Sequence, residues 1–286
     1  GGVFRMKDIN LWNLPDLQVG SDADESLIER RHNSRFATPL IDGAVVREES
    51  IAGVQCLIVS SSQPKFSYLH FHGGGFRLGW TRTWLNYASD IALKADCQVV
   101  IPDYRLAPEH PYPAALVDAV GVYTELQSEG EVFVGGDSAG GALALSLTLA
   151  ARDSKHQMPA GLVLLSPWLD LAATAASYEK NASTDTMFSR DSAEQAAVAY
   201  LGTYATTDPL ASPAYGDFSR VPKALIFVSA SEVLLDDAVQ FANKARQSGV
   251  AVDLHVVENM PHIWPVIMVD AAETVDARQK IVAFLS

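Results

Sequence analysis

The chain has 286 residues, 48% of them hydrophobic and 19% charged, with a formal net charge of −13. This size suits one large α/β domain, and the acidic balance disfavours nucleic acid and anionic membranes as partners. No apolar run reaches the roughly 18 residues of a membrane span, and no secretory signal is recognisable, so neither is expected. The two cysteines, Cys56 and Cys97, stand in apolar stretches, which favours reduced core thiols and a cytoplasmic location.

Apolar, strand-like segments alternate along the chain with helix-like segments. The expected strands are 56–60, 66–71, 98–102, 131–135, 161–166, 224–229 and 252–257. The expected helices carry apolar residues at helical spacing and are 84–95, 114–127, 142–152, 236–248 and 271–285. This order predicts a mostly parallel sheet that is covered by helices on both faces.

Two segments interrupt this alternation. Residues 1 to about 45 are polar with scattered Trp and Leu, and residues 167–222 separate two strands and contain a helix-like stretch at 191–200. Neither segment is long enough to build its own core. We therefore expect a single domain over 1–286, in which both segments pack together as a cap over the carboxyl edge of the sheet, where ligands bind in open α/β folds.

Three consecutive glycines follow the expected strand 66–71 in the motif His72-Gly73-Gly74-Gly75. Without Cβ atoms, such residues can present backbone N–H groups to a developing oxyanion, and Gly74 and Gly75 are the predicted donors. A flexible turn or a phosphate-binding loop is the alternative. The Lys and Ser/Thr of a P-loop are missing, however, and no G-x-G-x-x-G opens a helix here.

The motif Gly136-Asp137-Ser138-Ala139-Gly140 joins an apolar strand to an Ala/Leu-rich helix. Glycines on both sides of Ser138 allow a sharp turn that exposes the hydroxyl group and directs the helix N-terminus toward whatever the serine attacks. Taken alone, the motif could also be an ordinary glycine-rich connection. If Ser138 is a nucleophile, the N–H of Ala139 supplies a third oxyanion donor.

A serine nucleophile needs a histidine to take its proton and a carboxylate to orient that histidine. In a strand-to-helix elbow the expected chain order is serine, acid, histidine, which leaves His255 and His262 as candidate bases. His255 belongs to an alternating strand pattern, whereas His262 follows that strand in a loop. We therefore predict that His262 is the base.

The acid is expected in the loop that follows the strand 224–229. Glu232 comes directly after the strand end, whereas Asp236 and Asp237 open a helix, where carboxylates serve as caps and dipole partners. The longer side chain of Glu can hold the imidazole as Asp does. Glu232 is the predicted acid, with Asp236 as the second candidate and Asp237 as the third.

Four motifs in order resemble those of the bacterial hormone-sensitive-lipase-like carboxylesterases of the α/β-hydrolase fold. They are the HGGGF motif at 72–76, DYRLAPEH at 103–110, PAA at 113–115 and GDSAGG at 136–141. The resemblance covers about residues 66–265 and implies that Ser138, Gly74 with Gly75, and His262 form the active site. The family usually has Asp-Pro-Leu-x-Asp at the acid loop, and Glu232 stands here in place of its first Asp.

The predicted reaction is hydrolysis of small, short-acyl carboxylic esters through an acyl-serine, without a metal or other cofactor. Plausible substrate-contacting side chains are Trp12, Phe76, Trp80, Met187 and Phe188. A lactonase, amidase or peptidase could use the same triad. A non-catalytic binding protein, similar to the plant gibberellin receptors, is a further alternative, but those proteins lack the histidine. A homodimer through the last strand, 252–257, is compatible with the family.

Overall fold

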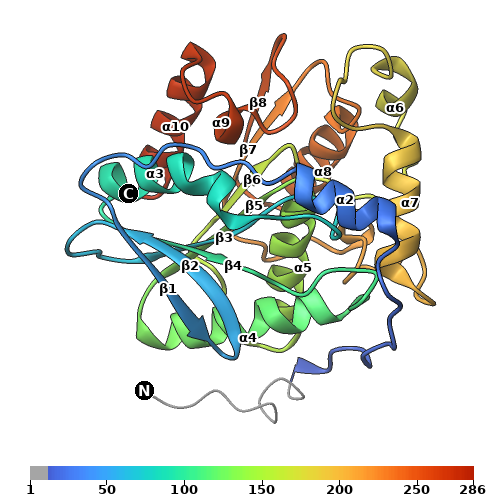
Figure 1. The fold of residues 1–286 in the computed structure, drawn as a ribbon, viewed down its shortest axis with the longest axis horizontal. Coiled ribbons are helices and arrows are strands. Elements are labelled where there is room, and N and C mark those ends of the chain that lie inside the picture. Colours follow the sequence, from blue (N-terminus) through green and yellow to red (C-terminus); the bar gives the residue numbers. More distant parts are fainter. Residues whose placement is uncertain (1–11) are drawn as a thin grey trace.

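The computed structural model describes residues 12–286 and contains a sheet of eight strands in the order β1-β2-β4-β3-β5-β6-β7-β8 (Figure 1). The first two neighbour pairs, β1 with β2 and β2 with β4, are antiparallel, and all other pairs are parallel. The strands are β1 (Val45–Ile51), β2 (Val54–Ser60), β3 (Ser67–Phe71), β4 (Gln98–Pro102), β5 (Val132–Asp137), β6 (Leu162–Leu165), β7 (Ala224–Ser229) and β8 (Val252–Val257).

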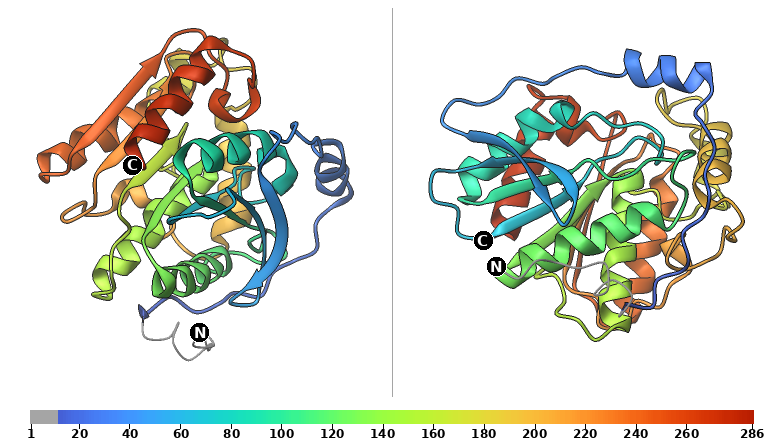
Figure 2. Two further views of the ribbon diagram at one scale, coloured as in Figure 1. Left: turned by 90° about the vertical axis from the view of Figure 1, so that its left-hand side faces the viewer. Right: turned by 60° about the horizontal axis from the view of Figure 1, so that its bottom comes forward.

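Helices cover both faces of this sheet. One face carries α3, α9 and α10, and the other carries α4, α5 and α8 (Figures 1 and 2). The α-helices are α2 (Glu25–Asn33), α3 (Leu85–Ala95), α4 (Ala114–Glu129), α5 (Ala139–Asp153), α6 (Ser177–Lys180), α7 (Arg190–Leu201), α8 (Leu235–Gln247), α9 (Trp264–Ile267) and α10 (Ala272–Phe284). No helix within residues 12–286 combines the length and apolar character needed to cross a membrane.

The hydrophobic core lies in two layers, one on each side of the sheet. Successive residues of a strand point to opposite faces, so each buried strand supplies both layers. In β6, Leu162 and Leu164 join the layer under α4, α5 and α8, while Val163 and Leu165 join the layer under α3 and α10. Burial on both faces explains why these strands are recognisable as continuous apolar runs.

Three of the expected strands, 98–102, 224–229 and 252–257, match β4, β7 and β8 to the residue. The main difference is β1, which is missing from the sequence-based expectation. It is an edge strand with the sequence VVREESI, and most of its residues are exposed. Charged residues are common on edge strands because they discourage pairing with other chains, and here they hide the strand pattern.

The two segments expected to form a cap lie next to each other. Helix α2 with the residue after it, and helix α7, contribute lining residues to the same cavity. Gln18 Nε2 donates a hydrogen bond of 2.9 Å to the carbonyl of Leu201 at the end of α7, and Tyr204 Oη donates to the carbonyl of Asp16 at 3.0 Å. The N-terminal segment is therefore attached to the 167–222 segment by side-chain-to-backbone hydrogen bonds.

Candidate active site

The loops that follow β5, β6, β7 and β8 meet at the carboxyl edge of the sheet, because these four parallel strands are consecutive neighbours. Ser138 follows β5 and immediately precedes α5. Its backbone angles are φ 53° and ψ −122°, an unusual conformation for a residue other than glycine. A Cβ on Gly136 or Gly140 would collide with neighbouring carbonyl oxygens, so both glycines are needed for this turn.

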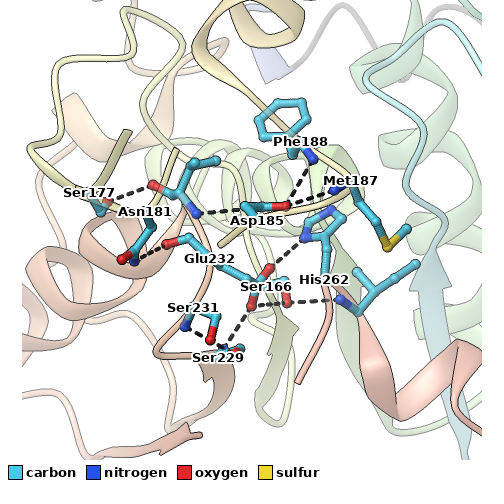
Figure 3. A network of polar contacts seen from close by, with 12 residues as sticks. Ser166, Ser177, Asn181, Asp185, Met187, Phe188, Ser229, Ser231, Glu232 and His262 are labelled. Atoms are coloured by element: carbon cyan, nitrogen blue, oxygen red, sulfur yellow. Dashed lines mark hydrogen bonds and ion pairs between the residues drawn. The ribbon is translucent and has the colours of Figure 1, made fainter. Parts of the chain in front are cut away.

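His262 and Glu232 form a buried pair (Figure 3). His262 Nδ1 donates to Glu232 Oε1 at 2.6 Å, and the two residues are 7% and 1% exposed. The second carboxylate oxygen, Oε2, accepts hydrogen bonds from Ser166 Oγ at 2.9 Å and from the N–H of Ser229 at 2.7 Å. Each carboxylate oxygen thus has a donor, which is what a buried negative charge requires.

Two opposing effects act on the pKa of His262. Burial lowers the pKa because it disfavours the charged imidazolium. The hydrogen bond to Glu232 and the negative charges of Glu232, Asp185 and Asp137 raise it and outweigh burial, so the pKa of His262 lies above its ordinary value. A protonated His262 is therefore stabilised, as a base that accepts a proton during a reaction requires.

The alternative candidates for the acid and the base have other partners than Glu232 and His262. Asp236 accepts a hydrogen bond of 2.9 Å from the backbone N–H of Ser177, at the start of α6. Asp237 accepts two backbone N–H groups from the loop after β6. His255 lies on β8 and pairs with Asp253 at 3.0 Å. The structure therefore brings Glu232, and neither aspartate, into contact with the loop histidine.

The glycine loop after β3 passes beside Ser138, since a Cβ on Gly73 would lie 3.1 Å from the serine Cβ. The N–H of Gly73 donates to Asp137 Oδ2 at 3.1 Å, whereas those of Gly74 and Gly75 have no acceptor within residues 12–286. Ala139 is the first residue of α5, where backbone N–H groups have no acceptor within the helix. Three donors are thus available near the serine.

A cavity of about 260 Å³ connects these parts, and Gly74, Gly75, Ser138 and His262 line it. Trp80, Met187 and Phe188 also line this cavity, and the ring of Phe188 stacks on that of His262 with a centroid distance of 5.9 Å. The residues described contain no group of three or more His, Cys, Asp or Glu side chains that could hold a metal ion.

The expectation for Phe76 and Trp12 needs correction, because neither lines the cavity. Phe76 is 1% exposed and stacks on Tyr200 of α7 at 3.6 Å between centroids. Trp12 is buried against His156. Both aromatic side chains fill the core, which is the commonest role of such residues.

Sequence reasoning missed the residues that hold the acid loop. Ser166 donates to Glu232 and accepts the N–H of Ile263 at 3.1 Å, linking the loops after β6, β7 and β8. Asp185 accepts the N–H of Val233 at 2.9 Å and those of Met187 and Phe188 at 3.0 Å (Figure 3). The contacts to Glu232, Ile263 and Val233 join residues far apart in the chain, so no local pattern marks them.

Comparisons with known proteins agree with this fold. A family model described as alpha/beta hydrolase fold matches residues 68–266. An esterase of Acinetobacter venetianus is 37% identical over 67% of this chain and 65% of its own length, and an acetyl-hydrolase of Streptomyces hygroscopicus is 36% identical over 68% and 67%. The chain thus spans about two thirds of these relatives. A solved hormone-sensitive lipase from a metagenome library has a TM-score of 0.87 and 31% identity, covering 93% of this chain and 92% of that one.

Proposed function

Because the chain belongs to the hormone-sensitive-lipase-like esterases of the α/β hydrolase fold, we propose that it hydrolyses small carboxylic esters through an acyl-serine. The observation that carries this proposal is that Ser138 and His262 line one cavity and that His262 contacts the buried Glu232 at 2.6 Å. A hydroxyl, an imidazole and a buried carboxylate are the groups that acyl transfer to serine requires.

In the first step, Ser138 Oγ attacks the ester carbonyl while His262 Nε2 takes the hydroxyl proton. Glu232 stays ionised and accepts the Nδ1–H bond, which keeps Nε2 as the basic nitrogen and stabilises the imidazolium that forms. His262 then gives the proton to the leaving alkoxide, and the alcohol departs. In the second step, water attacks the acyl-serine while the same histidine takes a proton from it. His262 then returns this proton to Ser138 Oγ as the acid is released.

The tetrahedral oxyanion of both steps would be stabilised by N–H groups of Gly74, Gly75 and Ala139. The free N–H groups of the glycine loop support this role, because the neighbouring N–H of Gly73 is already bonded to Asp137. One such donor is worth roughly 3 to 4 kcal/mol of transition-state stabilisation.

The cap selects the substrate in this proposal, with Trp80, Met187 and Phe188 as contacts and the whole chain as one domain. The cavity of about 260 Å³ lies below the ~300–1,000 Å³ of pockets for drug-sized ligands, which favours a short acyl chain. The similarity to a protein named acetyl-hydrolase points the same way. A lactonase or amidase with the same triad remains the second candidate.

Two further parts of the proposal concern the protein's surroundings. Cys56 and Cys97 are free and buried, which supports a cytoplasmic location.

β8 is an edge strand whose outer side is unpaired within the described chain, so it offers a surface for a homodimer through strand pairing. Sedimentation of the purified protein with and without a proline at a β8 position would test the dimer.

The experiment that tests the function is a hydrolysis panel with wild type and Ser138→Ala. It comprises p-nitrophenyl esters of increasing chain length, lactones and anilides. We expect the highest kcat/KM on short acyl esters and a loss of at least about 10⁴-fold in Ser138→Ala. Retained esterase activity in the variant would refute the proposed nucleophile. Better turnover of anilides or lactones would select the second candidate.

A further inference from the structure

Two arginines line the same cavity as the proposed catalytic groups. Arg30 belongs to α2, and Arg77 follows the glycine loop by two residues. Apolar side chains, with Leu78, Trp80 and Phe188 among them, also line it. The same cavity thus carries the proposed acyl-transfer groups and two cationic side chains.

Neither arginine has a carboxylate partner within ion-pair distance in residues 12–286. The neighbouring Arg31 shows the contrast, because its guanidinium binds Glu109 through two hydrogen bonds of 2.6 and 2.8 Å. Arg31 is therefore neutralised by the protein itself. Arg30 is exposed and Arg77 half-buried, and both remain uncompensated.

Burying a guanidinium without an ion-pair partner costs free energy, and Arg77 is the more buried of the two arginines. Burial, followed by the positive charges of Arg30 and Arg31, lowers the pKa of Arg77, and the charge of Asp24 offsets this only in part. The Nε atom of Arg77 is buried without any hydrogen-bond partner. A buried donor with no acceptor is costly, so the protein itself leaves this guanidinium only partly satisfied.

The negative charge of the whole molecule strengthens the argument that these arginines bind an anion. With a net charge of −13, the protein repels anions in general, so a small-molecule anion gains nothing from the overall field. Two guanidiniums without an ion-pair partner in the described part of the chain line the substrate cavity and make the potential there less negative. A planar guanidinium matches the oxygen pairs of carboxylate and phosphate groups.

We propose that the enzyme prefers esters that also carry an anionic group, a carboxylate or a phosphate, which Arg30 and Arg77 bind while the scissile carbonyl lies at Ser138. This inference rests on the proposed esterase function. It narrows the substrate class from small esters to anionic ones and gives α2, which comes from the N-terminal segment, a direct role in specificity.

The test compares esters that share one scissile bond and differ in charge. 4-Acetoxyphenylacetate is measured against its methyl ester, 4-acetoxyphenyl phosphate against 4-methoxyphenyl acetate, and mono-p-nitrophenyl adipate against p-nitrophenyl methyl adipate. The first two pairs place the anion on the alcohol side, as carboxylate and as phosphate, and the third places it on the acyl side. We expect kcat/KM to favour the anionic member of at least one pair by about tenfold or more, after correction for intrinsic alkaline hydrolysis rates.

Arg77→Met and Arg30→Met then remove the charge while keeping most of the side-chain length. Backbone contacts of Arg77, including its N–H to the carbonyl of Gly74, do not depend on the guanidinium. The anionic-to-neutral ratio of kcat/KM should fall by about tenfold in Arg77→Met. Arg47→Met is the matched control, because Arg47 lies on β1, pairs with Glu49 and does not line the cavity. It changes the net charge equally and should leave the ratio unchanged.

The outcomes separate this inference from the function on which it rests. If Ser138-dependent hydrolysis of the neutral esters is observed but no pair favours its anionic member in wild type, the anion proposal fails and the esterase proposal stands. An equal change of the ratio in Arg47→Met and Arg77→Met would also overturn it, since net charge alone would then explain the preference. If no ester is hydrolysed, the proposed function itself fails.

Discussion

The cavity has a floor, formed by residues 73–84 after β3 and by the segments after β5 and β8, and a roof, formed by the N-terminal segment and residues 187–196. The loop after β7 supports the floor through Glu232. On the floor, Glu232 and His262 are 1% and 7% exposed and are connected by hydrogen bonds to several loops. On the roof, Phe36 and Met187 line the cavity but are 52% and 50% exposed. Buried polar networks tolerate little change, whereas exposed apolar side chains can vary at low cost. The floor is thus suited to fixed chemistry and the roof to adjustable specificity.

The largest effect should come from the floor acid. Glu232→Gln keeps the size of the side chain but removes the charge that stabilises the imidazolium, so we expect kcat to fall by about 10³–10⁴-fold. Asp236→Asn is the matched control, because it makes the same chemical change in a residue that contacts α6, and it should cost less than about tenfold. Equal losses in steady-state assays of both variants would remove Glu232 from its proposed role.

The pH dependence tests the same network. Since only neutral His262 can accept a proton and its pKa is raised, kcat/KM should decline on the acid side of a midpoint above pH 6.5, by about tenfold per pH unit well below it. In Glu232→Gln, burial is no longer offset by the charge of Glu232, so the midpoint should move to lower pH. A midpoint that stays in place in this variant would mean that another group controls the rate.

A smaller effect is expected at Ser166, which supports the acid without touching the histidine. Ser166→Ala removes one donor to the Glu232 carboxylate and one acceptor for Ile263, and kcat should fall by about 10–100-fold. Ser146→Ala, a buried serine of α5, controls for simple loss of a hydroxyl. If thermal unfolding shows equal stability of both variants and Ser166→Ala retains full activity, the floor is less rigid than proposed.

The smallest effect should come from the roof. Met187→Ala enlarges the cavity at an exposed position, so KM for short acyl esters should rise a few-fold while kcat changes little, and longer acyl chains should gain relative to short ones. Separate kcat/KM values for p-nitrophenyl acetate and p-nitrophenyl hexanoate would measure this shift. A large loss of kcat would show that roof and floor are not separable at this residue.

The same contrast explains what could be predicted from the sequence. The comparisons confirm the α/β-hydrolase fold and the family. Both could be predicted because buried strands form continuous apolar runs and because the HGGG and GDSAGG motifs reflect local backbone requirements. The positions of Glu232 and His262 after strand ends predict the pair, and the structure brings them together. Their catalytic roles stay predictions.

What could not be predicted depends on contacts between distant segments. Ser166 and Asp185 reach the acid loop only after the sheet has brought the strand ends together. Arg30 comes to the cavity because α2 and α7 both contribute to its lining, and nothing in the local sequence of Arg30 marks this placement. Phe76 was misplaced for the same reason, since an aromatic residue after a glycine loop fits a pocket wall and a core position equally well in sequence.

The central claim is that Ser138 is the nucleophile of a working triad. The most direct measurement is reaction with diethyl p-nitrophenyl phosphate, followed by peptide mass spectrometry and by quantitation of the released p-nitrophenol. The account predicts one equivalent of p-nitrophenol and a diethylphosphoryl adduct on Ser138, with much slower labelling in Glu232→Gln. An unmodified Ser138, or an adduct on another residue that accounts for the loss of activity, would contradict it.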